Sequence, residues 1–228
     1  MGLLSVTRVS APRILSDLVK FEVDTSYVRE FGTLTANNPV VIGTPLGKIS
    51  AGAVTTAAKA GGNTGNGVLT LDPTTPKLVG ARPGVYTVRF IAAATNGGTF
   101  RVEDPNGDVI GDGQVGAAFV DDVKFTIADG ATDFVVGDGF DITIAAGSGK
   151  IVVLSATGLD GSSKCIGFSF VNRDPGNADQ LKGVTYGARG PLVVADAGIV
   201  WPAGFTADQK LAAIADVTAL GIVVRPAF

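Results

Sequence analysis

The sequence contains a Gly-x-Gly-x-x-Gly pattern from Gly111 to Gly116, which in dinucleotide-binding proteins cradles a pyrophosphate. That chemistry needs the pattern at a turn from a strand into a helix, where backbone N–H groups meet the phosphate. Here the following residues continue towards a β-type alternation, so we expect a plain turn. Gly147-Ser-Gly-Lys150 is no P-loop either, because it lacks the upstream glycine and is followed by Ile151 in place of Ser or Thr.

Aspartates could hold a metal or act as paired acids, but their spacing favours turns. Asp104-Pro-Asn-Gly-Asp108 is similar to the start of a calcium-binding loop. However, Val109 and Val115 occupy the sixth and twelfth positions, where such a loop needs Gly and Glu. Asp121 and Asp122 are adjacent, so on a strand their side chains point to opposite faces and cannot easily flank one bond. Because Asp accepts hydrogen bonds from nearby backbone N–H groups, we expect these residues to shape turns.

The chain has no histidine and a single cysteine, Cys165. This removes His-dependent triads, the common His-containing metal sites and any intrachain disulfide. Cys165 lies in an alternating run, which favours a small buried core residue over a reactive thiol. The sequence therefore predicts a protein that is not an enzyme, with no catalytic, cofactor-binding or metal-binding residues.

Composition limits the partners. The net charge is −3, with no basic patch to neutralise phosphates, so we expect no nucleic-acid partner. No apolar run approaches the roughly 18 residues of a membrane span, and we expect no membrane partner. Residues 1–8 lack a charged segment followed by an apolar one, so no signal peptide is expected.

The middle of the chain alternates apolar and polar residues with a period of two, which predicts half-buried antiparallel strands. The alternating runs are Tyr86–Phe90, Phe100–Val102, Phe125–Ile127 and Phe140–Ile144. Gly- and Asn-rich turns separate them, so the region predicts a small antiparallel β-sandwich or barrel. The preceding stretch Ala57–Gly67 is rich in Gly and small residues and predicts a flexible connection.

Near the C-terminus the sequence predicts one helix and a final strand. Thr206 and Gln209 form a capping box, and Gly221 supplies the left-handed residue that ends the helix. The β-branched run 222–224 that follows predicts a buried strand.

Core or interface anchors are expected around this helix. Leu211, Ile214 and Thr218 share one stripe of it, and Trp201 with Pro202 is expected to fix its entry.

Several of these segments together resemble the lambda-type bacteriophage head decoration proteins, the protein D family. Gly43 to Ile49 is similar to the family's "G-x-x-L-G-K-I" turn. The other matching segments are Ile14–Glu22, Tyr27–Glu30, Val152–Leu154, Asp160–Ser163 and the C-terminal run Gly190–Arg225. The matching segments fall into two parts, roughly 14–53 and 150–225. In the simplest family members these parts nearly touch, so the resemblance implies an insertion here.

The fold class implied is mainly β, with a minor α+β character. It comprises a β-clip-like decoration-protein core with one C-terminal helix, plus the inserted β domain. The expected divisions are an N-terminal arm at 1–30, a discontinuous core at 31–64 and 149–228, and the insertion at 65–148.

The resemblance further implies a homotrimer that cements a virion. Its partner would be the major capsid protein, bound on the outer surface of the expanded capsid, and the chain would be made in the host cytoplasm. Binding would stabilise the shell against internal DNA pressure. The arm is the expected capsid contact, and its candidate residues are Leu15, Leu18, Val19, Phe21, Tyr27, Arg29 and Phe31. The alternative for several of them is packing within the trimer's own body.

A different class of function also fits a β-rich chain: an adhesive or carbohydrate-binding β module. This alternative predicts a signal peptide and an exposed platform of aromatic side chains. With one Trp and three Tyr in the sequence, such a platform would be sparse. Within the decoration reading, residues 65–148 would project outwards and contact host surfaces or glycans weakly.

Overall fold

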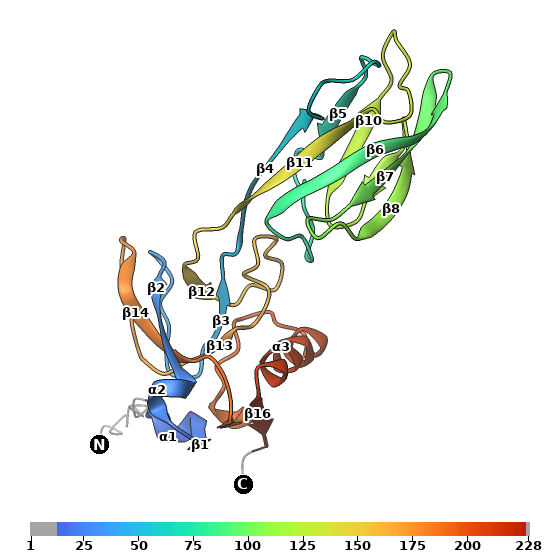
Figure 1. Ribbon diagram of the computed structural model, residues 1–228. Helices are drawn as coiled ribbons and strands as arrows, with labels where there is room; N and C mark the ends of the chain where they lie inside the picture. Colours follow the sequence, from blue (N-terminus) through green and yellow to red (C-terminus); the bar gives the residue numbers. More distant parts are fainter. Residues whose placement is uncertain (1–12, 227–228) are drawn as a thin grey trace, which may run out of the picture. The chain divides into compact units, whose positions relative to one another are not determined.

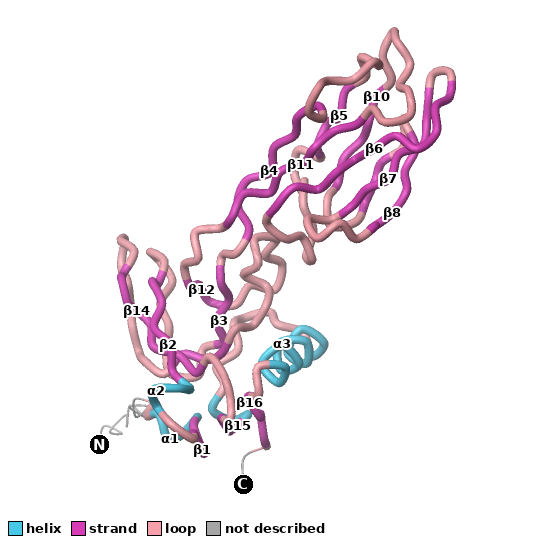
Figure 2. Tube along the Cα trace, in the orientation of Figure 1, coloured by secondary structure: helices cyan, strands magenta, loops and turns pink. Residues whose placement is uncertain are grey.

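The computed structural model describes residues 13–226. Residues 1–12 and 227–228 lie outside the described residues. Residues 1–12 include the start of the expected N-terminal arm and the segment that was considered as a signal peptide. The described chain is mainly β, as the sequence predicts, with α3 as its one long helix (Figure 1; Figure 2). It divides into two compact units. Unit 1 contains the described residues up to Leu46 and from Cys165 onward, and unit 2 is Gly47–Lys164.

Unit 1 is built from short strands and helices of both chain ends. In chain order its elements are α1 (Leu15–Leu18), β1 (Val19–Glu22), α2 (Thr25–Val28), β2 (Arg29–Leu34), β3 (Pro45–Lys48, which runs on into unit 2), β13 (Gly167–Ser169), β14 (Gln180–Gly187), β15 (Leu192–Ala195), the 3-10 turn Asp196–Gly198, α3 (Ala207–Ala219) and β16 (Ile222–Arg225). Strands β1, β15 and β16 form one sheet, with β15 antiparallel to β1 and parallel to β16. Strands β2, β14, β13 and β3 lie in that order in the wall of a small closed barrel.

The first glycine of the family-like turn marks a close backbone approach. Gly43 has a φ of +92°, and a Cβ there would lie 2.0 Å from the carbonyl oxygen of Gly198. Its N–H donates to the carbonyl of Ser169 at 2.9 Å, and its carbonyl accepts from Val200 at 3.0 Å. Only glycine fits a left-handed position this crowded, which explains the residue at this place in the motif.

Helix α3 begins and ends where the sequence predicts. The Thr206 hydroxyl accepts from the N–H of Gln209 at 3.3 Å, and the Gln209 side chain accepts from the N–H of Thr206 at 2.9 Å. Gly221 takes a φ of +80° just past the end. Together they satisfy backbone groups that a helix leaves free at its termini.

The stripe of Leu211, Ile214 and Thr218 is not the face of α3 that packs into the core of unit 1. The buried residues of the helix are Ala213 and Val217, whereas Leu211 is 64% exposed and Thr218 is exposed. The helix is so rich in alanine that more than one face is apolar, and the largest residues do not decide which face packs.

Strand β16 is also less buried than expected. Only Ile222 is fully buried, and Val223 is 42% exposed. The strand has β15 as its single neighbour in the sheet, so one edge and part of one face stay open.

Unit 2 contains two sheets. Its strands are β4 (Ala51–Ala58), β5 (Val68–Leu71), β6 (Gly84–Ala94), β7 (Gly97–Glu103), β8 (Val109–Gln114), β9 (Ala118–Val120), β10 (Lys124–Ala128), β11 (Gly139–Ala146) and β12 (Ile151–Val153). One sheet has the order β4-β11-β6-β7-β8 and the other β5-β10-β9, with antiparallel neighbours throughout. Strand β4 reaches Ala58 because it pairs with β11, so the expected flexible connection begins later than Ala57.

The alternating residues of both sheets form one hydrophobic cluster, as the period of two predicts. Every apolar position of the four alternating runs lies in it, and each is at most 7% exposed. Phe90 stacks on Phe134 with ring centroids 4.2 Å apart, and Phe119 stacks on Phe125 at 5.2 Å. This aromatic core gives unit 2 a large buried apolar surface of its own.

Candidate functional site

The glycine pattern at 111–116 has no nucleotide-binding geometry. It covers the end of β8 and the turn into β9, and no helix follows it. Gly116 takes a φ of +82° in that turn. The pattern is therefore the end of a strand and a turn that leads into the other sheet, and the predicted plain turn is confirmed.

The aspartates near turns bond the backbone around them. Asp104 accepts from the N–H groups of Asn106 and Asp108 at 2.8 and 2.9 Å, and these bonds contribute to a lowered pKa of its carboxyl. Asp122 accepts from the Tyr86 hydroxyl at 3.1 Å. Within residues 13–226, no three His, Cys, Asp or Glu side chains are grouped so as to hold a metal ion.

Cys165 is buried, as the sequence predicts, and burial raises the pKa of its thiol to about 12. A thiol with that pKa is protonated at neutral pH and is a poor nucleophile. Its backbone N–H donates to Asp216 of α3 at 2.9 Å, so the residue helps to anchor the helix.

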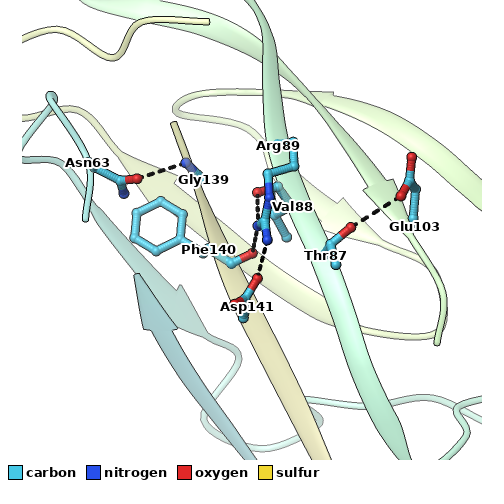
Figure 3. A network of polar contacts seen from close by, with 8 residues as sticks. All are labelled: Asn63, Thr87, Val88, Arg89, Glu103, Gly139, Phe140 and Asp141. Carbon is cyan, nitrogen blue, oxygen red and sulfur yellow. Dashed lines mark hydrogen bonds and ion pairs between the residues drawn. The ribbon is translucent and has the colours of Figure 1, made fainter. Parts of the chain in front are cut away.

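A polar network lies on the five-stranded sheet of unit 2 (Figure 3). Arg89 pairs with Asp141 at 2.5 Å and donates to the carbonyl of Phe140 at 2.8 Å. Thr87, on the same strand β6 as Arg89, donates to Glu103 of β7 at 3.3 Å. These charged groups bind one another across strands, so the network stabilises the sheet and presents no acid–base pair free to act.

The clearest surface feature of unit 1 is a set of exposed apolar side chains near the start of the described chain. We call this set the N-terminal apolar surface, and its members are Ile14, Phe21, Val23, Tyr27 and Phe31. Each is 53–64% exposed, although each is large. Large apolar side chains gathered in one exposed stretch are typical of a protein–protein contact.

Ordered short elements hold this surface in place. Phe21 lies opposite Val193 in the β1–β15 pairing, so strand pairing fixes its position. Leu18 of α1 and Val28 of α2 are fully buried, so each short helix is anchored by a core side chain. Of the predicted contact residues, Leu18 is therefore core, whereas Leu15 and Val19 are half-buried.

Tyr27 is oriented by charges on both sides. Asp24 caps α2 and accepts from the N–H groups of Ser26 and Tyr27 at 2.7 and 3.1 Å. Hydrogen bonds from Ser26 and Tyr27 lower the pKa of Asp24. Arg189 lies 5.5 Å over the Tyr27 ring, donates to the Tyr27 carbonyl at 2.9 Å and pairs with Glu30. The ring is thus held without being covered.

Arg29 is used within the unit. Its guanidinium donates to both carboxylate oxygens of Glu22, which raises the pKa of Arg29, and it lies 5.3 Å over the ring of Phe170. A bidentate pair of this kind fixes the geometry between β1 and β2. Arg189, which the sequence analysis did not single out, is the cation that faces the exposed Tyr27.

Sequence reasoning missed Ile14 and Val23, and also Leu181, which is 86% exposed on β14. The signal at Leu181 was a large apolar residue between Gln180 and Lys182 next to Gly183, a composition typical of a turn. Lys182 indeed has a φ of +51°.

The expected anchors around α3 lie in different environments. Trp201, Pro202 and Ile214 are half-buried, and the Trp201 ring lies 6.1 Å from that of Phe205. Lys210 lies 6.0 Å over the Trp201 ring. Leu211 faces outward and is free to contact a partner.

These features describe a structural, partner-binding protein: a β scaffold whose polar groups stabilise its own strands and which exposes several large apolar side chains between Ile14 and Phe31. The chain belongs to the bacteriophage lambda head decoration protein D family, whose model matches residues 9–222. It is therefore a phage head decoration protein, a structural component of the virion capsid. The match includes the whole N-terminal apolar surface and helix α3.

A search of curated proteins found no match. Two solved structures share local likeness, both of Xanthomonas campestris FlgL, in space groups H3 and C2. They are 26% and 27% identical to this chain over 48% and 46% of it, each with a TM-score of 0.30. The chain spans about a third of their length, 34% and 32%. Among the described residues, no helix has the length and apolar character needed to cross a membrane.

Proposed function

We propose that this chain binds the outside of the expanded capsid as a homotrimer and stabilises the shell against the pressure of packaged DNA. The observation that supports this most is the family match over residues 9–222. A trimer that binds only the assembled lattice adds interface that must break before the shell opens, so binding stabilises the shell by mass action. Its ring of three would use a head-to-tail contact that closes on itself.

The proposed capsid contact is the N-terminal apolar surface, with Phe21, Tyr27 and Phe31 as its main residues. Their exposure leaves apolar area for a partner to cover, and Arg29 holds the strands that present it. Strand β1 is an edge of its sheet, so a capsid strand could pair beside it. Leu18 is left out of this contact because it is fully buried, and Leu15 and Val19 contribute from its margin.

A pair of matched variants tests this contact. Phe21→Ser and Phe31→Ser each remove an exposed aromatic whose burial is worth about 1.5–3 kcal/mol, so each should weaken capsid affinity about 10- to 100-fold. The measurement is co-sedimentation with expanded capsids that lack the protein. Leu181→Ser removes a large apolar residue that is even more exposed but lies outside the surface, so this variant should bind as the unchanged chain does. Equal affinities for all variants would contradict the proposed contact.

Leu211 is proposed as an anchor of the trimer interface, with Trp201, Pro202 and Ile214 supporting it. Its exposure on α3 has no explanation within unit 1. Leu211→Lys should convert a trimer in solution into a smaller species, as measured by light scattering. The change lies outside the fold's core, so the melting temperature of the chain should stay close to its original value.

We also propose that residues 65–148 form a β-sandwich module inserted into the decoration core, with β4 extending its sheet upstream. A cavity of about 190 Å³ on its smaller sheet supports a weak host-glycan contact. Thr70 and Thr126 line it, beside an ion pair of Lys124 with Asp72 at 2.8 Å. Leu71 and Phe125 add apolar surface to the lining, and a mainly apolar hollow with a few polar groups is typical of sites for small ligands.

A glycan array with the full chain and Lys124→Ala tests that contact. Binding that the variant loses supports the sugar site. Absence of binding by the unchanged chain leaves the module as a spacer and removes the adhesive alternative. The capsid proposal does not depend on this result.

A further inference from the structure

The five-stranded sheet of unit 2 ends in two edge strands, β4 and β8. Strand β8 carries Asp112, paired with Arg101 at 2.8 Å, and its register against β7 shifts between Val102 and Glu103. A charge and a bulge are devices by which sheet edges avoid pairing with other strands. Residues 53–58 of β4, Ala-Val-Thr-Thr-Ala-Ala, contain no charge and no proline.

The start of β4 is closed by a lysine. Lys77 Nζ donates to the carbonyl oxygens of Ala51, at 3.0 Å, and Gly52. Burial lowers the pKa of Lys77, which fits its place against the strand. Beyond Gly52 this protection ends, and the strand is exposed at every residue from 53 to 58 except Val54, which is half-buried. Figure 1 shows β4 at the margin of its sheet, with β11 on one side.

The direction of the backbone groups follows from one hydrogen bond. The N–H of Lys59 donates to the carbonyl of Gly139 at 3.0 Å, and Ala58 lies opposite Phe140. Antiparallel strands alternate between residues that bond the neighbour and residues that point away. Thr55 and Ala57 therefore bond towards β11, while the N–H and C=O groups of Val54, Thr56 and Ala58 point to the open edge.

We propose that this open edge pairs antiparallel with the same edge of a second copy of this chain. With Thr56 opposite Thr56 of the second copy, Val54 lies opposite the other Ala58, and the outward backbone groups of both strands meet. The contact is isologous, so it has two-fold symmetry.

Charge decides between this partner and other strands. If a charged strand paired with this neutral edge, the charge would lose hydration, and no opposite charge on the edge would compensate for that loss. The other edge strands are less suitable: β8 carries Asp112, β16 carries Arg225, β1 carries Lys20 and Glu22, and β5 and β9 have four and three residues. Two β4 edges bring no like charges together and match in length.

Such a contact is weak alone, because it adds few hydrogen bonds and little apolar burial. Copies held side by side on a surface reach effective concentrations in the millimolar range, where weak contacts form. On a capsid, the two-fold contact would join copies from different trimers into a continuous net; this extension rests on the proposed function.

Sedimentation equilibrium of the full chain up to about 1 mM tests the pairing. We expect the weight-average mass of the unchanged chain to rise with concentration. Thr56→Pro removes an N–H that points to the open edge and leaves the bonds to β11, so the rise should disappear. The constant mass of this variant then shows whether the chain is a trimer or a monomer without the edge contact. A monomer mass would contradict the trimer proposal without affecting the test of the edge pairing.

A second pair of variants keeps the test decisive if Thr56→Pro does not fold. Thr55 and Thr143 lie opposite each other on β4 and β11, and both are exposed. Thr55→Lys places a charge on the edge and should abolish the association, whereas Thr143→Lys places the same charge one strand inward and should preserve it. Association of folded Thr56→Pro or Thr55→Lys at the original strength, or no association of the unchanged chain at 1 mM, would overturn the proposal.

Discussion

The two units bury their large side chains differently. Unit 2 places six phenylalanines, Phe90, Phe100, Phe119, Phe125, Phe134 and Phe140, in one internal cluster. Unit 1 builds its core mainly from aliphatic residues such as Leu18, Leu34 and Leu192 and leaves Phe21, Tyr27 and Phe31 exposed. Unit 2 thus buries these aromatic side chains within itself, whereas unit 1 buries Phe168 and Phe170 but leaves three other aromatic side chains exposed. This difference is the reason for proposing that unit 1 makes the capsid contact.

The largest loss of stability is expected from a substitution in the core of unit 2. Phe90 is 1% exposed and stacks on Phe134, so Phe90→Ala should lower the free energy of unfolding of unit 2 by about 3–5 kcal/mol. Phe31→Ala, at a 64% exposed position, should change it by less than about 0.5 kcal/mol. Urea unfolding of both variants measures this, and equal losses would remove the proposed distinction between the units.

A smaller effect is expected at Asp138, which joins two loops of unit 2. Its carboxylate is 3% exposed and accepts from the N–H groups of Thr64, Gly65 and Val135 at 2.9, 3.0 and 3.1 Å. Asp138→Ala leaves these donors without their acceptor and should cost about 1–3 kcal/mol. Asp138→Asn, which keeps one oxygen, should cost less.

The same residue predicts a pH dependence. Burial raises the pKa of Asp138, but the N–H donors of Gly65, Thr64 and Val135 outweigh burial, so its pKa lies below the ordinary 3.8. A lowered folded-state pKa means that the unfolded chain takes up the proton first as pH falls. The stability difference between the unchanged chain and Asp138→Asn should be full above about pH 4 and shrink below it. A difference that grows on acidification would contradict this assignment.

The smallest effect is expected at the cap of α3 in unit 1. Thr206→Ala removes the acceptor for the N–H of Gln209 and should cost about 1 kcal/mol. Thr218→Ala is the matched control, because its hydroxyl bonds back to the Ile214 carbonyl at 2.7 Å inside the helix and alanine favours helix. Thermal unfolding should show a loss for the first variant alone.

Local patterns predicted much of this fold. The alternating runs became strands because a period of two matches the pleat, and the capping box at Thr206 formed because its partners are neighbours in sequence. Gly111–Gly116 and Asp104 were likewise readable as turn and strand residues. In each case the deciding contacts lie within a few residues or repeat regularly.

Contacts between segments that are far apart in the chain could not be predicted from the sequence in the same way. Leu18 at the end of α1 is buried and Phe21 on β1 is exposed although both are large and apolar. The packing of α1 and the pairing of β1 with β15 decide this, and both involve segments far away in the sequence. Strand β4 has a weak apolar alternation and exists through its pairing with β11. The sequence could not show whether Leu211 faces the core or a partner, because an alanine-rich helix has no single apolar face.

The central claim is that unit 1 holds the chain on the capsid and thereby strengthens it. The direct measurement adds purified chain to expanded, DNA-filled particles that lack it and records both bound protein and the temperature at which the particles rupture. We predict saturable binding on the outer surface, seen by electron microscopy at three-fold positions, and rupture at a higher temperature. Chain that stays in the supernatant, or bound particles that rupture at the original temperature, would contradict the account.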